Sequence, residues 1–370
     1  MSISRRNAIA GGLIVPASTA FGSQANSKVQ VAALGTGNRG SYDTRYLAED
    51  PRVQVTAVCD TNPASIDRVK TAAPAAAQAR VFKDARELFT AGGFDAVLIA
   101  TPVYMHPEHF ELAARAGKHI YCEKPAGASV SGVKRLRAAA GAMKASQVVF
   151  FGFQQRFSPE YLAAEQLLRT GKLGELLLMR AEWMVGGIRT NAPKPSEEQL
   201  ARMWYPWREK SGDFIVEQDC HGVDVLNWFA QAHPVSAIGG GWKGRRPFGN
   251  NLDHVNVTYA YPGGLPGYLH GTQLIQTAGL VREQFFGTLG SVETHRRYYE
   301  AAYPGQKPVR VASKREITID ALEAFVTHIV EGKSYNMADV ACDATLTSLL
   351  GRLAVDLKRE VTWEELLKTA

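Results

Sequence analysis

The chain has 370 residues, which is too long for one ordinary hydrophobic core and fits two domains. Hydrophobic residues make up 45% of the chain and charged residues 21%, which argues against both a disordered protein and a membrane bundle. The net charge of +6 is spread along the chain without a Lys/Arg block between aromatic residues, so we expect neither nucleic acid nor a membrane as a partner.

The N-terminal segment has the pattern of an export signal. Ser4-Arg5-Arg6 supplies a charged start, a weakly apolar run follows from Gly11 to Ala20, and small residues suited to cleavage come next. The adjacent arginines resemble a twin-arginine signal, whose pathway exports folded proteins. We therefore expect the first 25 residues to direct export, to the periplasm.

A glycine-rich loop follows the first predicted strand, residues 28–34 (KVQVAAL), and precedes a helix-compatible stretch from Ser41 to Glu49. Such a loop binds a dinucleotide: the first glycine permits a tight turn, the second lets the backbone approach the pyrophosphate, and the third lets the helix pack closely. The helix N-terminus then presents free N–H groups to the phosphates. The predicted cofactor-binding residues of the loop are Gly35, Gly37, Asn38, Arg39 and Gly40.

The second predicted strand, residues 53–60 (VQVTAVCD), ends in an acidic residue 20 positions after Gly40. A carboxylate at this place accepts hydrogen bonds from the adenosine ribose. Asp60 favours NAD over NADP because it would repel a 2′-phosphate, although the nearby Arg39 leaves NADP open.

Strands and helices continue to alternate up to residue 150, which predicts a parallel sheet with ligands bound at the carboxyl ends of its strands. The predicted elements are a helix over Asp84–Ala91, a strand over Ala96–Thr101, a helix over Glu108–Ala116, a strand over His119–Cys122 and a helix over Ser131–Ala145. The segments at the expected cleft are Thr101-Pro102 with His106, and Glu123-Lys124-Pro125.

Glu123-Lys124-Pro125 after a short strand resembles the glucose–fructose oxidoreductase and inositol dehydrogenase superfamily, Gfo/Idh/MocA. The likeness runs from Val29 to Leu367 and includes a strand expected over Gly152 to Arg156, a helix with His221 to Asp224, and Val361 to Leu366. The resemblance implies a Rossmann domain followed by an α+β domain with a large, open, mostly antiparallel sheet. It also implies NAD or NADP as the cofactor and hydride transfer on a sugar or polyol.

The resemblance implies two catalytic elements. Lys124 would lie beside the nicotinamide and stabilise a developing alkoxide, with a pKa depressed toward neutrality. His221 would be the general acid or base on a helix, with Glu217 one turn before it in place of the family's usual aspartate. Glu123, Thr101, Pro102 and His106 would line the cofactor cleft, His106 alternatively as a loop cap. Arg156 would contact the cofactor or form a salt bridge that braces the domains.

Beyond the cofactor domain, alternating polar and apolar runs predict an antiparallel sheet whose open face is suited to oligomerisation. The predicted strands are Glu175–Val185, Val235–Trp242, His254–Tyr261, Gly267–Ile275 and Val281–Leu289. The stretch from Ile319 to Lys358 reads as helical and is expected to pack back onto the cofactor domain. The expected domains are 28–150 for the dinucleotide, 151–345 for substrate and oligomerisation, and 346–370 as a C-terminal helical segment.

Four scattered cysteines, Cys59, Cys122, Cys220 and Cys342, have no metal-ligand spacing, so we expect buried thiols and no metal, with a disulfide left open. Two alternative functions remain open. The first is an NAD-dependent glycosidase of the same superfamily, which oxidises C3 transiently and cleaves by elimination. The second is a non-catalytic dinucleotide-bound sensor, against which the presence of both Lys124 and His221 argues.

Overall fold

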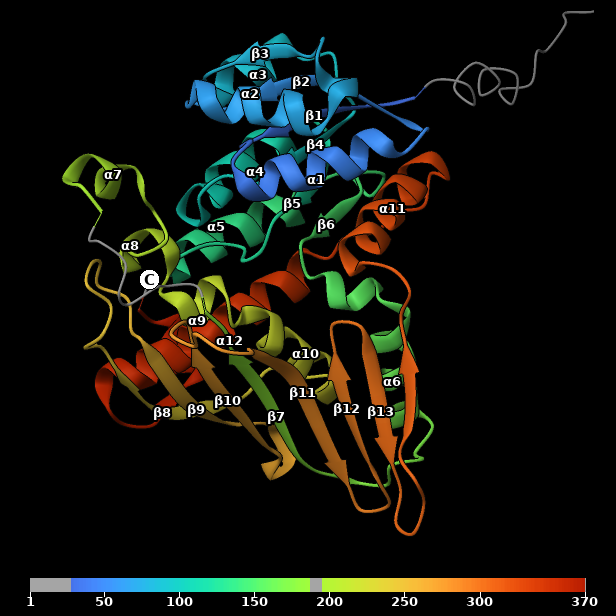
Figure 1. Ribbon diagram of the computed structural model, residues 1–370, viewed down its shortest axis with the longest axis vertical. Helices are drawn as coiled ribbons and strands as arrows, with labels where there is room; N and C mark the ends of the chain where they lie inside the picture. The colour runs from blue at the N-terminus through green and yellow to red at the C-terminus, as the bar shows by residue number, and fades with distance from the viewer. Residues whose placement is uncertain (1–27, 187–194, 370) are drawn as a thin grey trace, which may run out of the picture.

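The first part of the chain folds into a parallel sheet with helices on both faces (Figure 1). The computed structural model describes residues 28–186 and 195–369. The strands of the first sheet, in the order β3-β2-β1-β4-β5-β6, are β1 (Val29–Leu34), β2 (Val53–Cys59), β3 (Arg80–Phe82), β4 (Ala96–Ile99), β5 (His119–Cys122) and β6 (Val149–Phe151). This strand order is that of a Rossmann fold, as predicted.

Short helices connect these strands and bury their apolar faces against the sheet. They are α1 (Asn38–Glu49), α2 (Pro63–Ala72), η2 (Pro74–Ala76), α3 (Ala85–Ala91), η3 (Val103–Met105), α4 (His106–Arg115) and α5 (Val130–Gly141). Several begin at side-chain caps that the sequence provides, such as Asp84 before α3 and Ser129 before α5. Apart from the exposed edge strand β3, the strands are largely buried, which explains their continuous apolar runs.

The second part is built on a nine-stranded sheet in the order β14-β13-β12-β11-β7-β10-β9-β8-β15. All neighbours are antiparallel except β7 and β10, so the predicted mostly antiparallel sheet is confirmed. Its strands are β7 (Leu176–Met184), β8 (Ser236–Trp242), β9 (His254–Ala260), β10 (Pro266–Thr272), β11 (Leu280–Gly287), β12 (Ser291–His295), β13 (Tyr298–Ala302), β14 (Val309–Ala312) and β15 (Val361–Thr362).

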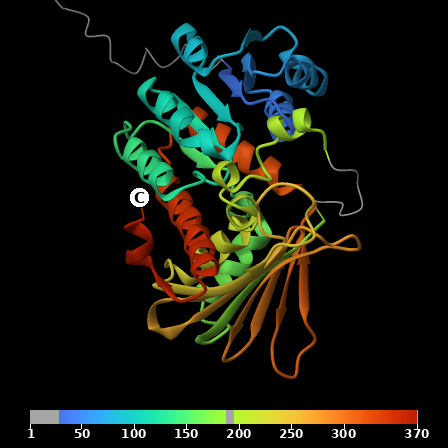
Figure 2. The same ribbon diagram turned by 90° about the vertical axis from the view of Figure 1, so that its left-hand side faces the viewer.

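The longer helices of the second part lie on the side of this sheet that faces the first sheet (Figure 2). The helices of the second part are η4 (Gln154–Phe157), α6 (Pro159–Arg169), α7 (Glu197–Arg202), α8 (Arg208–Ser211), α9 (Phe214–Glu217), α10 (Cys220–Ala230), η5 (Pro262–Gly264), α11 (Ile317–Val330), α12 (Ala338–Leu357) and α13 (Trp363–Leu367). The contacts to the sheet come from α6, α10 and α12, whereas no helix in the described ranges covers the opposite face.

The C-terminal helices differ from the single helical stretch expected over residues 319–358. The helix ends after α11, and the carbonyl oxygen of Tyr335 accepts a hydrogen bond from the backbone N–H of Val149 on β6. Helix α11 buries Leu322, Phe325 and Val326 against the first sheet, whereas α12 packs on α5 of the first domain and on α10 and β8 of the second. The expected limit between residues 345 and 346 therefore falls inside α12, a continuous helix that joins both domains.

The segment from Gly152 to Arg156 is also not the strand that the sequence suggested. Strand β6 ends at Phe151, and residues 154–157 form the 3-10 helix η4, with Arg156 N bonded to Phe153 O at 3.2 Å. A short apolar run does not distinguish a strand from a helical turn. Four cysteines are free and buried, as expected: Cys59, Cys122, Cys220 and Cys342.

Candidate active site

The glycines after β1 allow a tight junction between strand and helix. Gly35 has a φ of +85°, which favours glycine, and a Cβ there would lie 2.7 Å from the backbone of Ala100. A Cβ on Gly40 would lie 1.8 Å from the carbonyl oxygen of Gly35, so only glycine lets α1 begin against β1. A Cβ on Gly37 would meet nothing within 4 Å. Gly37 therefore borders open space at the N-terminus of α1, where the fold binds a pyrophosphate.

Asp60 lies at the end of β2 and holds the glycine loop in place. Its carboxylate accepts hydrogen bonds from the backbone N–H of Thr36 at 2.8 Å and of Asn62 at 2.8 Å. Asp60 remains partly exposed, so it can still receive hydroxyl groups of a ribose. Asn38, the first residue of α1, accepts a hydrogen bond from Arg68 at 2.9 Å.

A cavity of about 260 Å³ lies at the carboxyl ends of β1, β4 and β5, where the two domains meet. It brings together residues from widely separated parts of the chain. Its lining residues are Arg39, Ala100, Thr101, Val103, His106, Glu123, Lys124, Gln154, Trp204, Glu217, His221 and Arg296. Most of the residues predicted for the catalytic end of the cleft are therefore gathered here.

Lys124 follows β5, and its ammonium group reaches across the domain boundary to Glu217. Its Nζ lies 3.6 Å from Glu217 Oε1 and also donates a hydrogen bond to the carbonyl oxygen of Glu217. Burial has the largest single effect and lowers the pKa of Lys124, but the charge of Glu217, together with smaller contributions from Cys220 and Glu123, raises the net pKa. The expected depression toward neutrality is thus not seen in the protein without cofactor. Lys124 is an ammonium cation ready to stabilise a negative oxygen.

Glu217 and His221 do not share one helix, contrary to the spacing argument. Glu217 ends α9 and His221 lies in the first turn of α10, with Gln218 and Asp219 between the two helices. Both side chains nevertheless line the cavity. Glu217 and His221 reach the same cavity from two successive short helices. The i, i+4 spacing of one unbroken helix therefore does not explain why they lie near each other.

His221 is buried and held between an aromatic ring and an amide. Its ring stacks on Trp183, with centroids 5.1 Å apart and planes 9° apart, and its Nδ1 lies 3.2 Å from Gln155 Oε1. Since Oε1 is an acceptor, Nδ1 carries the proton and Nε2 offers the lone pair. Burial lowers the pKa of His221 well below its usual range, and the charges of Lys124 and Arg296 add to this. The imidazole is therefore neutral at neutral pH and can accept a proton.

Arg39, in the first turn of α1, forms an ion pair with the buried Glu123. Arg39 Nη2 lies 2.9 Å from Glu123 Oε1, and its Nε lies 3.0 Å from Asp43 Oδ2. Burial opposes the charge on Arg39, yet the two carboxylates keep its pKa raised. Burial raises the pKa of Asp43 well above its usual range, against the effect of Arg39. Arg39 and Glu123, both predicted to line the cleft, therefore lie at the cavity, where their ion pair holds the two side chains in place.

His106 connects the two loops that line the cleft. Its Nδ1 lies 2.7 Å from the carbonyl oxygen of Pro125, and its Nε2 lies 2.8 Å from that of Thr101. Both ring nitrogens are thus engaged by the backbone, which supports the loop-capping alternative. The Thr101 hydroxyl contacts His109 Nδ1 at 2.9 Å, and Pro102 precedes η3 without lining the cavity.

Arg156 lies elsewhere and makes a salt bridge, as one of the two alternatives expected, but with a residue of its own domain and not across the domain boundary. Its guanidinium contacts both carboxylate oxygens of Asp224, with Nε 2.8 Å from Oδ2 and Nη2 2.9 Å from Oδ1. It also stacks over Trp228 at 5.1 Å. Arg156 is not among the cavity residues, because η4 directs it toward α10. The placement does not support a role in cofactor binding.

Sequence reasoning missed two residues of this region. Arg296 comes from the turn between β12 and β13, where no motif marked it. Asp43 sits one turn after Arg39 on α1, and that i, i+4 spacing was a usable signal. Trp204 also lines the cavity; it begins an aromatic cluster, residues 204–208, whose composition suits a sugar ring and buried packing equally. Among the described residues no group of three His, Cys, Asp or Glu side chains is placed to hold a metal ion.

Glu283 on β11 supports the ring on which His221 stacks. Its fully buried carboxyl group accepts hydrogen bonds from Tyr161 at 2.9 Å and Thr294 at 2.8 Å, next to Trp183. Burial raises the pKa of Glu283 from 4.5 to about 7, although these donors oppose the rise. The folded protein therefore favours the protonated form.

We expect Glu283→Gln to stabilise the protein at alkaline pH only. The native preference for a protonated carboxyl stabilises the fold fully below pH 4.5 and is lost as the pH rises through 7. The variant should gain on the order of 3 kcal/mol in unfolding free energy at about pH 8, and little near pH 4.5, measured by denaturant titration. Exposed Glu175→Gln is the control. Equal destabilisation of Glu283→Gln at both pH values would contradict the assignment.

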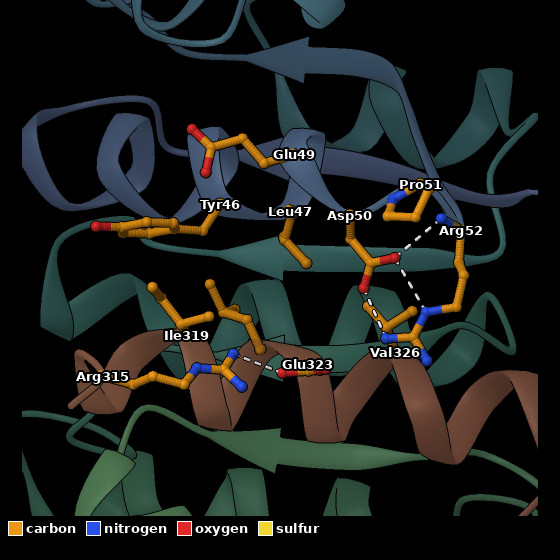
Figure 3. A pocket seen from close by; sticks show the side chains of 11 residues that line it. Tyr46, Leu47, Glu49, Asp50, Pro51, Arg52, Arg315, Ile319, Glu323 and Val326 are labelled. Atoms are coloured by element: carbon orange, nitrogen blue, oxygen red, sulfur yellow. Dashed lines mark hydrogen bonds and ion pairs between the residues drawn. The ribbon is translucent and has the colours of Figure 1, made fainter. Parts of the chain in front are cut away.

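A second hollow, of about 320 Å³, lies between α1 and α11 (Figure 3). Its charged groups pair with one another: Asp50 with Arg52 at 2.7 Å, and Arg315 with Glu323 at 2.6 Å. Leu47 and Val326 supply apolar walls. None of the residues predicted for catalysis or cofactor binding lines it, so the cavity at Lys124 is the candidate site.

Two protein-family models match the chain, one for each domain. The model described as an oxidoreductase family with an NAD-binding Rossmann fold matches residues 29–153. The model described as a GFO/IDH/MocA C-terminal domain matches residues 161–293. Within the described ranges no helix is long and apolar enough to cross a membrane.

Curated relatives share sequence mainly over parts of the chain. Inositol 2-dehydrogenase/D-chiro-inositol 3-dehydrogenase of Shouchella clausii is 36% identical over 201 residues, 54% of this chain and 52% of the relative. scyllo-Inositol 2-dehydrogenase (NAD(+)) of Bacillus subtilis is 26% identical over 270 residues, which cover 72% of this chain and 73% of the relative. Several relatives are matched over only 52–59% of their length.

The fold is shared with solved structures at low sequence identity. Levoglucosan dehydrogenase in complex with NADH and levoglucosan superimposes with a TM-score of 0.78 at 18% identity, over 91% of this chain and 99% of that one. scyllo-Inositol dehydrogenase from Lactobacillus casei with bound NAD(H) and scyllo-inositol superimposes with a TM-score of 0.74 at 19% identity, over 91% of this chain and 100% of that one.

Proposed function

Because the chain belongs to the Gfo/Idh/MocA oxidoreductase family, we propose that it is an NAD-dependent dehydrogenase that oxidises a carbinol of a sugar or cyclitol. One observation carries the proposal. The cavity beside the glycine loop holds the ammonium group of Lys124 and the neutral imidazole of His221 together. A cation and a base at one oxygen are what alcohol oxidation requires. The named relatives that act on inositols or levoglucosan point to the same substrate class.

The residues after β1 and β2 fit NAD. Gly37 would face the pyrophosphate at the N-terminus of α1, since a Cβ there would occupy space that the protein leaves open. Asp60 would bind the adenosine ribose and would repel a 2′-phosphate, which favours NAD over NADP. When bound, NAD supplies the hydride acceptor.

The chain's own residues handle the proton and the charge on oxygen. Oxidation of a carbinol removes a hydride from carbon and a proton from the hydroxyl group. Lys124 would bind that hydroxyl oxygen and stabilise its negative charge, and Nε2 of His221 would accept the proton. Gln155 fixes the tautomer through Nδ1, and Glu217 keeps Lys124 charged and directed across the cavity.

The test is turnover with a matched loop variant. Acid treatment of the purified protein should release NAD, and a panel of sugars and cyclitols should reduce added NAD. Gly37→Ala should keep the unfolding temperature, because its Cβ meets no atom, yet weaken NAD binding about tenfold or more. Gly40→Ala is the contrasting variant, since its Cβ meets the backbone and the fold itself should suffer. If no dinucleotide binds and no panel member reduces NAD, the proposal fails.

The same purified protein can be assayed to distinguish a dehydrogenase from an NAD-dependent glycosidase. In that chemistry the transient oxidation is reversed, so p-nitrophenyl glycosides should release nitrophenol without added NAD and without net reduction. Reduced NAD from free sugars and no nitrophenol release supports the dehydrogenase.

Export and self-association complete the proposal. The Arg5-Arg6 pair and the apolar run after it support export to the periplasm by a route that carries folded proteins; these residues lie outside the described ranges. The uncovered face and edges of the large sheet support a homo-oligomer. Exposed apolar side chains on its strands include Leu177, Ile238, Trp242, Val309 and Val311.

A further inference from the structure

Arg296 is a cation that the established elements of the site do not explain. It lies in the two-residue turn that follows the pair His295–Tyr298 of strands β12 and β13. Its side chain lines the cavity together with Lys124 and His221, and its guanidinium lies 5.9 Å from the ring centre of Trp183.

Arg296 forms no ion pair with an acidic side chain of the described residues, although its charge acts on the buried Glu283. Within residues 28–186 and 195–369 no carboxylate oxygen lies within 4.0 Å of its guanidinium, and the remaining segments contain no Asp or Glu at all. The other two cations of the cavity are paired, Lys124 with Glu217 and Arg39 with Glu123.

Acidic groups on the neighbouring strands are already engaged. Glu293 contacts Arg282 at 3.1 Å and pairs with His295, and the Glu283 carboxyl accepts from Tyr161 and Thr294. The cavity therefore carries one more positive charge than its acids neutralise. A guanidinium that is half-buried and unpaired is costly unless a ligand provides an anion.

We propose that Arg296 binds an anionic oxygen group of the substrate, so that the enzyme acts on a sugar or cyclitol bearing a carboxylate or a phosphate. This assignment rests on the proposed dehydrogenase function. The anion belongs to the substrate and not to the cofactor, because Gly37 and Asp60, which mark the cofactor's phosphates and ribose, do not line this cavity. A guanidinium binds such groups with two parallel hydrogen bonds, which orients the ring relative to Lys124 and His221.

The experiment compares matched ligands on the protein loaded with NADH, where binding is measured without turnover. Glucose, glucuronate and glucose 6-phosphate form one series, and galactose and galacturonate form another. We expect the anionic member of a series to bind about 10- to 100-fold more tightly than the neutral one by calorimetry, with a preference that falls as salt is raised. Comparison of glucuronate with glucose 6-phosphate shows which anion the site takes.

Arg296→Met should remove the preference for the anionic ligand, and Arg296→Lys should restore part of it. Arg297→Met, at the exposed neighbour on the same turn, is the matched control and should behave as wild type. Neutral ligands that bind as tightly as acidic ones, no binding of any anionic ligand, or an Arg296→Met variant with unchanged preference would each overturn the assignment. Turnover of neutral sugars with NAD in those cases would leave the dehydrogenase function standing, whereas NAD reduction by no ligand would refute that function separately.

Discussion

Replacing Lys124 with methionine should lower kcat/KM on the order of 10³-fold while NAD binding changes little. Methionine keeps most of the side-chain volume but removes the positive charge that would stabilise the substrate oxygen. Glu217, left without its partner, is 26% exposed and can be solvated, so the fold should persist. Steady-state kinetics together with NAD binding, followed by fluorescence, measures both effects.

The controls separate charge from structure. Exposed Lys144→Met removes a lysine away from the cavity and should leave kinetics unchanged. Glu217→Gln should shift any alkaline limb of the pH profile that reports Lys124 to lower pH, because Glu217 is what raises the pKa of that lysine. A Lys124→Met enzyme with nearly full activity, or one that no longer folds, would contradict the catalytic assignment.

Replacing His221 with alanine should lower kcat about 10²- to 10⁴-fold, the range of a lost general base. Added imidazole should restore part of the activity, since the cavity beside Trp183 would then have room for a free ring. A merely structural histidine would show no such rescue. His233→Gln, whose ring stacks on Trp363 outside the cavity, is the control.

The pH dependence gives an independent check on His221. Because burial and neighbouring cations lower the pKa of His221, the neutral base persists on the acidic side of the ordinary value of 6.5. Oxidation by the wild type should therefore lose activity through this group only below pH 6.5. Removing the charge of Arg296 should move that acid limb to higher pH. An acid limb of the wild type above 6.5 would argue against His221 as the base.

The match between sequence and structure was closest where a pattern is local. Gly35, Gly37 and Gly40 follow a buried strand. Their spacing alone identifies the turn, because the backbone at Gly35 and Gly40 requires a residue without a side chain and Gly37 leaves space for a pyrophosphate. Asp60 was found for the same reason, at the end of the next strand. Predictions were weaker for η4, where a few apolar residues fit either a strand or a helical turn.

Side-chain partners were not predictable in this way. The raised pKa of Lys124, the ion pair of Arg156 with Asp224 and the stacking of His221 on Trp183 all join segments far apart in the chain. A single sequence carries no distance between such segments. The spacing of Glu217 and His221 correctly predicted that the two side chains lie at the same cavity. The single helix expected to carry both was wrong, because two short helices stand in its place.

By itself, the sequence determined the dinucleotide fold and the position of Lys124, since parallel strands place the residues that follow them at one edge of the sheet. Only the tertiary structure decided which charges meet in the cavity. The turn that carries Arg296 reaches Lys124 and His221 because the large sheet folds against the first domain, and electrostatic effects depend on that distance and burial rather than on order along the chain.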